Sequence, residues 1–326
     1  MSKVALCVGI DYYENANCLN QCVADAFEMG HVLDRNGDGS KNFDEVVALY
    51  ATDERTAISK HQLRAMVEKL FKDQHEIALF YFAGHGAIDE YGGYLCTSEV
   101  ASVDSGLSMD VLMQIVAKSP AINKIIILDS CHSGTLGQMD AMNGFVKLPP
   151  NTTILAACTN DDVAYEGVFT PLVVDALTGG AMNLMGEVTV GSVYAHVDRA
   201  MGIWFQRPVF KTNTKNFVCL RKNVPPIDLN ILRKLVLHFP KPDYVYPLDP
   251  SYEEDNTYDE NNPRNANRDH NEKNEKIFQD LRKFYSVNLL VPVDADSMYE
   301  AAVRSKSCKL TALGKYYWRL VRTNRI

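Results

Sequence analysis

Short runs of aliphatic and aromatic residues alternate with longer amphipathic windows through most of the chain. In these windows the apolar residues recur at helical spacing, as expected for a parallel sheet whose strands are joined by crossover helices. The predicted strands are Val4–Ile10, Val46–Ala51, Glu76–Phe82, Ile125–Asp129, Thr152–Cys158 and one within Val209–Leu220. The predicted helices lie near Gln21–Leu33, Lys60–Phe71, Met109–Lys118, Pro171–Leu177 and Val193–Ile203. The pattern therefore predicts the α/β class, with a mostly parallel six-stranded sheet flanked by helices.

The composition of the chain changes after Leu220. Several prolines between positions 225 and 250 precede a long polar run, and such segments bury too little apolar surface to offset the entropy lost on ordering. An apolar pattern returns near Ile277. The sequence therefore predicts a large domain over 1–222, a linker over 223–276 and a small C-terminal module over 277–326, which is helical or winged-helix-like.

Composition limits the class of protein and its partners. The chain has 326 residues, 46% of them hydrophobic, and a formal net charge of −8. We therefore expect an ample core and no surface built throughout for nucleic acid or anionic membrane. The eight cysteines form no CxxC pair and no regular spacing, which favours reduced, mostly buried thiols. No signal peptide or apolar segment of membrane length is recognisable, so the sequence predicts a soluble cytoplasmic protein.

Two predicted strands end in residues suited to nucleophilic catalysis. Cys131 follows the strand Ile125–Asp129, at the sheet edge where open α/β folds place their ligands. His132 is its neighbour in sequence and would point to the opposite side of an extended chain, so we expect a structural role for it. His85 is flanked by glycines at the end of another predicted strand and is the expected base. The alternative is a buried structural cysteine with an unrelated histidine.

The stretches "FYFAGHG" and "IIILDSCHSG" resemble the two halves of the active site of caspases and metacaspases. The DSCHSG form resembles the metacaspase or prokaryotic caspase-like branch, and the likeness extends from about Lys3 to Leu220. It implies a caspase-like fold and a cysteine endopeptidase, in which the Cys131 thiolate attacks the peptide carbonyl and His85 transfers the protons. It also implies that the backbone amides of Gly86 and Cys131 hold the oxyanion. A non-catalytic scaffold of the same fold is the alternative.

The resemblance also implies which substrate residue precedes the scissile bond. Asp25 and Asp129 match two acids of the metacaspase pocket for that residue, and Cys22 matches a third lining position. Two carboxylates in a narrow pocket attract a cation, so we expect cleavage after Arg, whose planar fork reaches both acids, and then after Lys. Ala83 departs from the family pattern, in which a serine often lines the pocket. Alternatively, Asp25 is a helix surface charge and Asp129 is a hydrogen-bond acceptor at a strand end.

The loop 34–45 fits the pattern of an EF-hand calcium loop, with Gly39 at its tight turn. Its candidate oxygen ligands are Asp34, Asn36, Asp38 and Glu45. However, Lys41 stands where such loops usually have an apolar residue, and a predicted strand follows where an EF-hand has a helix. We therefore favour a polar turn, in which Gly, Asn and Asp adopt left-handed conformations, over a calcium site.

A second calcium hypothesis comes from the metacaspase resemblance. Many metacaspases are activated by calcium at another acidic cluster, and this chain has Asp104, Asp110 and Asp140 in the corresponding neighbourhoods. It lacks the paired aspartates of that cluster. The sequence therefore predicts no required cofactor and leaves calcium as the competing hypothesis.

The C-terminal module carries no catalytic signature. From Arg304 to the end there are seven Lys or Arg and no acidic residue, while the apolar residues keep helical spacing. We expect a basic face that binds a regulatory protein, with nucleic acid as the less favoured partner because the chain is acidic. Self-cleavage is expected within 251–276 or after Lys147. Similarity to prokaryotic caspase-like proteins indicates bacterial defence or stress signalling.

Overall fold

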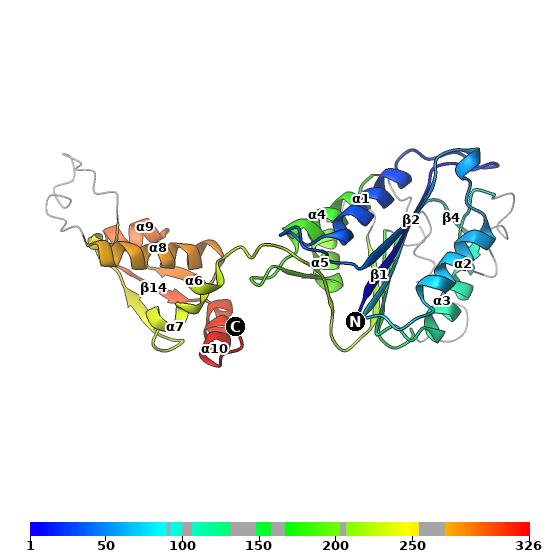
Figure 1. The fold of residues 1–326 in the computed structure, drawn as a ribbon. Coiled ribbons are helices and arrows are strands. Elements are labelled where there is room, and N and C mark those ends of the chain that lie inside the picture. The colour runs from blue at the N-terminus through cyan, green and yellow to red at the C-terminus, as the bar shows by residue number, and fades with distance from the viewer. Residues whose placement is uncertain (90–91, 100–105, 131–147, 158–166, 203–206, 254–270) are drawn as a thin grey trace. The chain divides into compact units, whose positions relative to one another are not determined.

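The computed structural model describes residues 1–89, 92–99, 106–130, 148–157, 167–202, 207–253 and 271–326. The chain forms two compact units, Met1–Val224 and Pro225–Ile326. Figure 1 shows both, with the colour running from blue at the N-terminus to red at the C-terminus.

A six-stranded sheet forms the centre of the first unit. Its strands are β1 (Lys3–Ile10), β2 (Glu45–Ala51), β3 (Ile77–Ala83), β7 (Asn123–Asp129), β8 (Thr152–Ala156) and β10 (Val209–Asn213). They lie in the order β10-β8-β7-β3-β1-β2, and each neighbouring pair is parallel except β8 with β10. The predicted α/β class and mostly parallel six-stranded sheet are confirmed.

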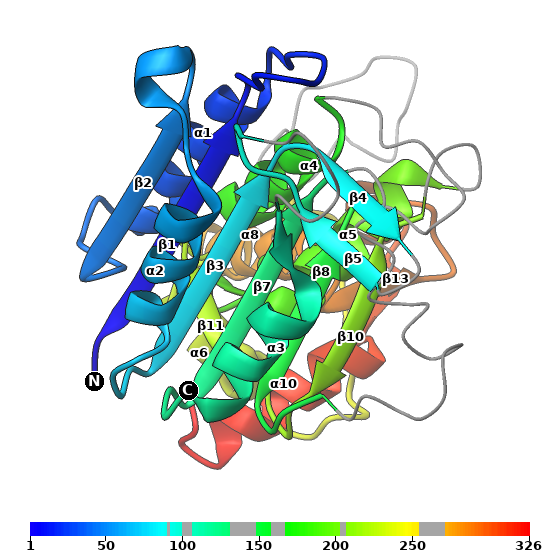
Figure 2. The ribbon, with the colours of Figure 1, turned by 90° about the vertical axis from the view of Figure 1, so that its right-hand side faces the viewer.

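Helices cover both faces of this sheet. On one face lie α2 (Lys60–Leu70) and α3 (Met109–Lys118), which Figure 2 shows in front of the strands. On the other face lie α1 (Cys22–Asp34), α4 (Phe169–Asp175) and α5 (Val190–Met201). A π-helical turn, Ala176–Gly180, continues α4. These helices overlap all five windows that the periodicity of the sequence predicts.

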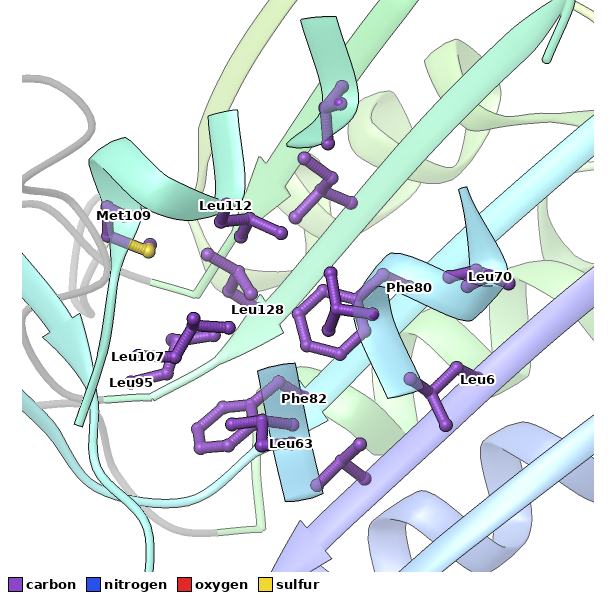
Figure 3. Packing of buried hydrophobic residues seen from close by; sticks show 14 of the residues in the cluster. Leu6, Leu63, Leu70, Phe80, Phe82, Leu95, Leu107, Met109, Leu112 and Leu128 are labelled. Carbon is purple, nitrogen blue, oxygen red and sulfur yellow. The ribbon is translucent and has the colours of Figure 1, made fainter. Parts of the chain in front are cut away.

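Strand β3 shows why both faces need a cover. All of its residues are buried, and successive side chains point to opposite faces. Phe80 and Phe82 belong to the cluster under α2 and α3, whereas Leu79 and Tyr81 belong to the cluster under α1, α4 and α5. Figure 3 shows the first cluster, in which the strand residues meet helix residues Leu63, Leu70 and Leu112. A strand that is buried on both faces reads as one continuous apolar run, as this one does.

Short strands lie beside the main sheet. β4 (Gly86–Asp89), β5 (Gly92–Leu95) and β6 (Leu107–Ser108) form an antiparallel sheet directly after His85. The last predicted strand, within Val209–Leu220, divides in two: β10 joins the main sheet, and β11 (Cys219–Lys222) pairs with β9 (Glu187–Thr189). A short 3₁₀ helix, Glu54–Thr56, follows β2.

The second unit combines helices with a three-stranded antiparallel sheet of order β12-β14-β13. Its strands are β12 (Val245–Pro247), β13 (Leu290–Val293) and β14 (Ser307–Leu310). Its helices are α6 (Leu229–Arg233), α7 (Leu235–His238), the 3₁₀ turn η6 (Pro250–Tyr252), α8 (Glu272–Ser286), α9 (Met298–Val303) and α10 (Ala312–Arg322). The winged-helix-like arrangement stays a prediction.

The residues expected to form a linker, 223–276, differ from that expectation in their described part. β12 pairs with β14, and Leu232, Leu235 and Phe239 are buried. These few apolar side chains pack against residues far away in sequence, so the local composition underestimates how much surface the segment buries.

Two further findings concern the described residues. Cys7, Cys18, Cys22, Cys96, Cys219 and Cys308 are free thiols, and four of them are buried. No helix in the described ranges is both long and apolar enough to span a membrane.

Candidate active site

The carboxyl ends of β1, β3 and β7 meet at one edge of the main sheet. In the register of the sheet, Gly9 of β1 lies beside Ala83, and Ala83 lies beside Asp129 of β7. His85 therefore follows β3 at the level where the chain leaves β7. Cys131, two positions after Asp129, lies outside the described residues, as does His132. The described geometry is that of the predicted base and the predicted pocket around this edge.

Three contacts from the loop between β1 and α1 hold His85. Its backbone N–H donates to the Tyr13 hydroxyl oxygen at 2.7 Å, and its ring lies 4.6 Å from the Tyr13 ring, centroid to centroid. The third contact joins Nε2 to the carbonyl oxygen of Asn17 at 2.8 Å. A carbonyl oxygen only accepts hydrogen bonds, so Nε2 carries the hydrogen. Nδ1 is therefore the ring nitrogen that can take up a proton.

Tyr13 fills the space beside Gly84. The side chain is 3% exposed, and burial raises the pKa of its phenol well above the usual range, so the hydroxyl stays neutral. A Cβ atom added to Gly84 would lie 2.6 Å from that hydroxyl oxygen, closer than real contacts allow. The glycine before His85 therefore makes room for the residue that holds His85. Gly86, a predicted oxyanion donor, begins β4.

The three predicted pocket residues act electrostatically on one buried tyrosine. Burial raises the pKa of Tyr81 well above its usual range, and the neighbouring Asp129, Asp25 and Cys22 raise it further, while a hydrogen bond with Thr170 opposes the rise. Asp25 and Cys22 are buried on α1, and Asp129 ends β7. Thr170, which bonds to Tyr81 and Asp129, lines the same cavity as Asp25, and Cys22 packs in the same core cluster as Tyr81. Residues from two distant parts of the sequence are therefore linked through Thr170 and Tyr81.

A chain of hydroxyl groups supports Asp129. Thr170 of α4 donates from Oγ1 to Oδ2 of Asp129 at 2.6 Å, and the Tyr81 hydroxyl lies 2.6 Å from the same Oγ1. A threonine hydroxyl has one hydrogen, and here Asp129 accepts it, so Tyr81 is the donor in the second contact. This relay holds the Asp129 carboxyl group in place.

A cavity of about 350 Å³ opens between α1 and α4 beside these residues. Its described lining contains three carboxylates and no basic side chain. Asp25 and Glu28 come from α1, and Asp175 comes from the end of α4. Asp175 also contacts His196, with 2.7 Å between Oδ2 and Nε2. The space next to the predicted pocket is therefore acidic.

The loop 34–45 is a turn held by its own polar groups and by one contact with β11. Asp34 contacts the Lys41 ammonium group, whose hydrogen bond lowers the pKa of that carboxyl. Oδ1 of Asp38 accepts from the Ser40 backbone N–H at 2.9 Å. Asn36 accepts through Oδ1 from the backbone N–H of Lys222 at 3.0 Å. Glu45 begins β2.

Among the described residues, no group of three or more His, Cys, Asp or Glu side chains is arranged to hold a metal ion. Of the second calcium hypothesis, Asp104 and Asp140 lie outside the described residues. Asp110 lies in the first turn of α3.

Sequence reasoning missed Tyr13 and Asn17. Asn17 acts through its backbone oxygen, which every residue type has, so no side-chain pattern could reveal it. Tyr13 stands in "GIDYYEN" directly after a predicted strand. The available signal was an aromatic residue directly after a strand, at the edge of the sheet where His85 also lies. The sequence does not tell which of the two adjacent tyrosines turns inward.

Comparison with known proteins identifies the family. Residues 2–234 match the family described as Caspase domain. The chain belongs to the caspase-domain family of cysteine peptidases. Metacaspase-1 of Meyerozyma guilliermondii is 32% identical over 169 residues, which cover 45% of this chain and 40% of that protein. Metacaspase-1 of Debaryomyces hansenii is 30% identical over 171 residues, which cover 45% and 37%. The match therefore spans about two fifths of each curated relative.

The fold is similar to that of a solved structure. A crystal structure of a protein from Geobacter sulfurreducens has a TM-score of 0.50 and 19% sequence identity, over 69% of this chain and 98% of that one. Caspase-1 from Spodoptera frugiperda has a TM-score of 0.49 and 10% identity, over 68% and 90%. The family match and the metacaspase relatives confirm the resemblance that the two active-site stretches indicate.

Proposed function

We propose that this caspase-domain protein is an endopeptidase that cleaves after Arg, and second after Lys, with Cys131 as nucleophile and His85 as base. One observation carries the proposal: the buried Asp25 lines the same cavity as Thr170, and Thr170 donates to Asp129 at the sheet edge that also holds His85. Two carboxylates beside a catalytic base make a pocket for a cationic side chain.

The proposed reaction follows from the hydrogen bond that His85 makes. Because Nε2 donates to Asn17, Nδ1 takes the proton of the Cys131 thiol, and the sulfur attacks the substrate carbonyl carbon. The N–H groups of Gly86 and Cys131 are the proposed donors to the oxyanion. The carbon–nitrogen bond breaks as His85 returns the proton to the leaving amine. Water then hydrolyses the thioester and restores the thiol.

Charge and geometry favour Arg over Lys and exclude Asp. A guanidinium group can form two parallel hydrogen bonds with a carboxylate and bond to both acids, whereas an ammonium group acts as a point charge. A substrate carboxylate would meet Asp25 and Asp129 as like charges and lose its own hydration. The acidic cavity between α1 and α4 adds to this preference.

The second unit is the proposed binding site of a regulatory protein. On α10, Leu313 and Tyr316 are 43% and 56% exposed, and Arg319 follows three residues after Tyr316, on the same side of the helix as that tyrosine. Apolar side chains next to a cation suit a protein partner with an acidic, partly apolar surface. No cofactor is part of the proposal.

Fluorogenic peptides test the proposed specificity. Peptides that end in Arg, Lys, Asp or Ala before the reporter are compared in kcat/KM, with Cys131→Ala as the inactive control. We expect kcat/KM to be highest for the Arg peptide, lower for the Lys peptide and small for the other two. We expect Asp25→Asn to lose about 1–3 kcal/mol of transition-state binding of the Arg peptide. Faster cleavage of the Asp peptide, or full Arg cleavage by Asp25→Asn, would overturn the assignment.

A further inference from the structure

The loop between β1 and α1, residues 11–21, contacts both halves of the proposed site. One set of contacts leads to His85, and another leads to the first turn of α1, which carries Cys22 and Asp25. The loop itself is fixed at its start. The backbone N–H of Asp11 donates to the carbonyl oxygen of Ala51 at 2.9 Å, and the carbonyl oxygen of Asp11 accepts from Leu19 at 2.8 Å.

Tyr13 makes the side-chain contacts of this loop with His85. Its hydroxyl oxygen accepts from the backbone N–H of His85 at 2.7 Å, and the two rings lie 4.6 Å apart with a tilt of 51°. The hydroxyl fixes where the chain turns after β3, and the ring limits how the imidazole rotates. Gly84 leaves the space that this arrangement needs. The neutral phenol touches the base and none of the bonds that form or break in the proposed reaction.

Asp11 holds the helix that bears the pocket. Its Oδ1 accepts from the backbone N–H of Cys22 at 2.9 Å and from that of Val23 at 3.4 Å. These N–H groups have no partner within α1, and they lie at the positive end of the helix dipole, where a carboxylate is stabilising. The contacts set the start of α1 relative to the sheet edge, and Asp25 lies only three residues after Cys22.

We propose that this loop is a two-armed positioning element: Tyr13 places the base, and Asp11 places the specificity pocket. The inference rests on the proposed peptidase function and adds residues that the sequence analysis did not assign. Its two arms act on different kinetic constants. Misplacing the base slows the chemical step, whereas misplacing the pocket weakens the binding of the basic side chain.

The test uses the full chain and Arg and Lys fluorogenic peptides. We expect Tyr13→Phe, which keeps the ring and removes the acceptor, to lower kcat about tenfold with little change in KM. We expect Asp11→Ala to raise KM for both peptides about fivefold, and Asp11→Asn, which keeps an acceptor oxygen, to recover much of that loss. Tyr12→Phe is the matched control in the same loop and should match the wild type in both constants.

Alkylation separates this inference from the peptidase assignment. Mass spectrometry of the peptide that contains Cys131 measures how fast iodoacetamide modifies this thiol. This reaction does not require the substrate pocket. Its rate should fall in Tyr13→Phe and stay unchanged in Asp11→Ala. A wild type that cleaves neither peptide contradicts the peptidase assignment, and the alkylation rates still test the Tyr13 arm. If the wild type is active and Tyr13→Phe keeps the wild-type kcat and alkylation rate, the proposed role of Tyr13 is wrong. If Asp11→Ala keeps the wild-type KM, the proposed role of Asp11 is wrong.

Folding of the variants is checked by their thermal unfolding midpoints. If Tyr13→Phe does not fold, Gly84→Ala replaces it, because the added methyl group would displace the Tyr13 hydroxyl. The same fall in kcat with KM preserved is expected. Wild-type kcat in a folded Gly84→Ala would contradict the role of Tyr13.

Discussion

Thr170 links Tyr81 and Asp129 through hydrogen bonds, so its loss should destabilise the folded protein. It lies 2.6 Å from both the Tyr81 hydroxyl and Asp129 Oδ2. Thr170→Val leaves the fully buried Tyr81 hydroxyl without this acceptor, and an unsatisfied buried group costs about 1–3 kcal/mol. We expect that loss in the free energy of unfolding, measured by urea denaturation. The double variant Tyr81→Phe/Thr170→Val should lose about 1 kcal/mol less than the sum of the two single variants. Additive losses would contradict the relay.

The buried thiol of Cys7 predicts a pH dependence of stability. Burial raises its pKa from 9.0 to about 12. Between these values the unfolded chain releases the thiol proton and the folded chain keeps it, so the free energy of unfolding falls as the pH rises. In Cys7→Ala this alkaline fall should be shallower, although the variant is less stable at every pH because of the cavity. Urea denaturation at several pH values from 8 to 11 under reducing conditions measures both slopes. Equal slopes would exclude the thiol as a cause.

The residues predicted from the sequence are those whose side chains are proposed to carry the chemistry. His85 was identified by its flanking glycines, and Asp25 and Asp129 by the family pattern; in the structure Thr170 bonds to Asp129 and lines the same cavity as Asp25. The residues that support them escaped prediction because their roles depend on the path of a loop. Tyr13 and Asp11 act through backbone N–H groups of distant residues, and sequence periodicity contains no information about such contacts.

Periodicity placed the strands of the main sheet and the five helices that cover it within a few residues, because each buries a regular apolar face. The short strands beside the main sheet were not predicted. The segment before α8 was misjudged because its prolines occupy positions that tolerate them. Pro247 lies in β12, an edge strand, and Pro250 begins a 3₁₀ turn. Proline is confined to such positions within folded structure. A count of prolines therefore does not distinguish a linker from short ordered elements.

The turn 34–45 yields a prediction about calcium. Because Asp34 and Asp38 already contact Lys41 and Ser40, calcium would have to displace these partners before it could bind. We expect no saturable heat in isothermal titration with micromolar calcium, and unchanged peptidase activity after removal of calcium with a chelator. Micromolar binding that disappears in the variant Asp34→Ala/Glu45→Ala would instead establish an EF-hand-like site.

At the scale of the whole molecule, the first unit has cores of its own. Both hydrophobic clusters around the main sheet consist entirely of residues from the first unit. We therefore expect a chain that ends at Val224 to unfold cooperatively and to cleave the Arg peptide. Comparison with the full chain, by thermal unfolding and by kcat/KM, separates folding from regulation. A truncated chain that does not fold would contradict the independence of the first unit. A folded truncated chain with altered kcat would support control by the second unit.

We propose that Cys131 and His85 cleave proteins after basic residues selected by Asp25 and Asp129. The most direct test incubates a denatured proteome with the wild type and with Cys131→Ala, and identifies the new amino termini by mass spectrometry. We expect cleavage sites that require Cys131 and are preceded mainly by Arg and then Lys. Sites preceded by Asp, or the same sites in the Cys131→Ala sample, would contradict it.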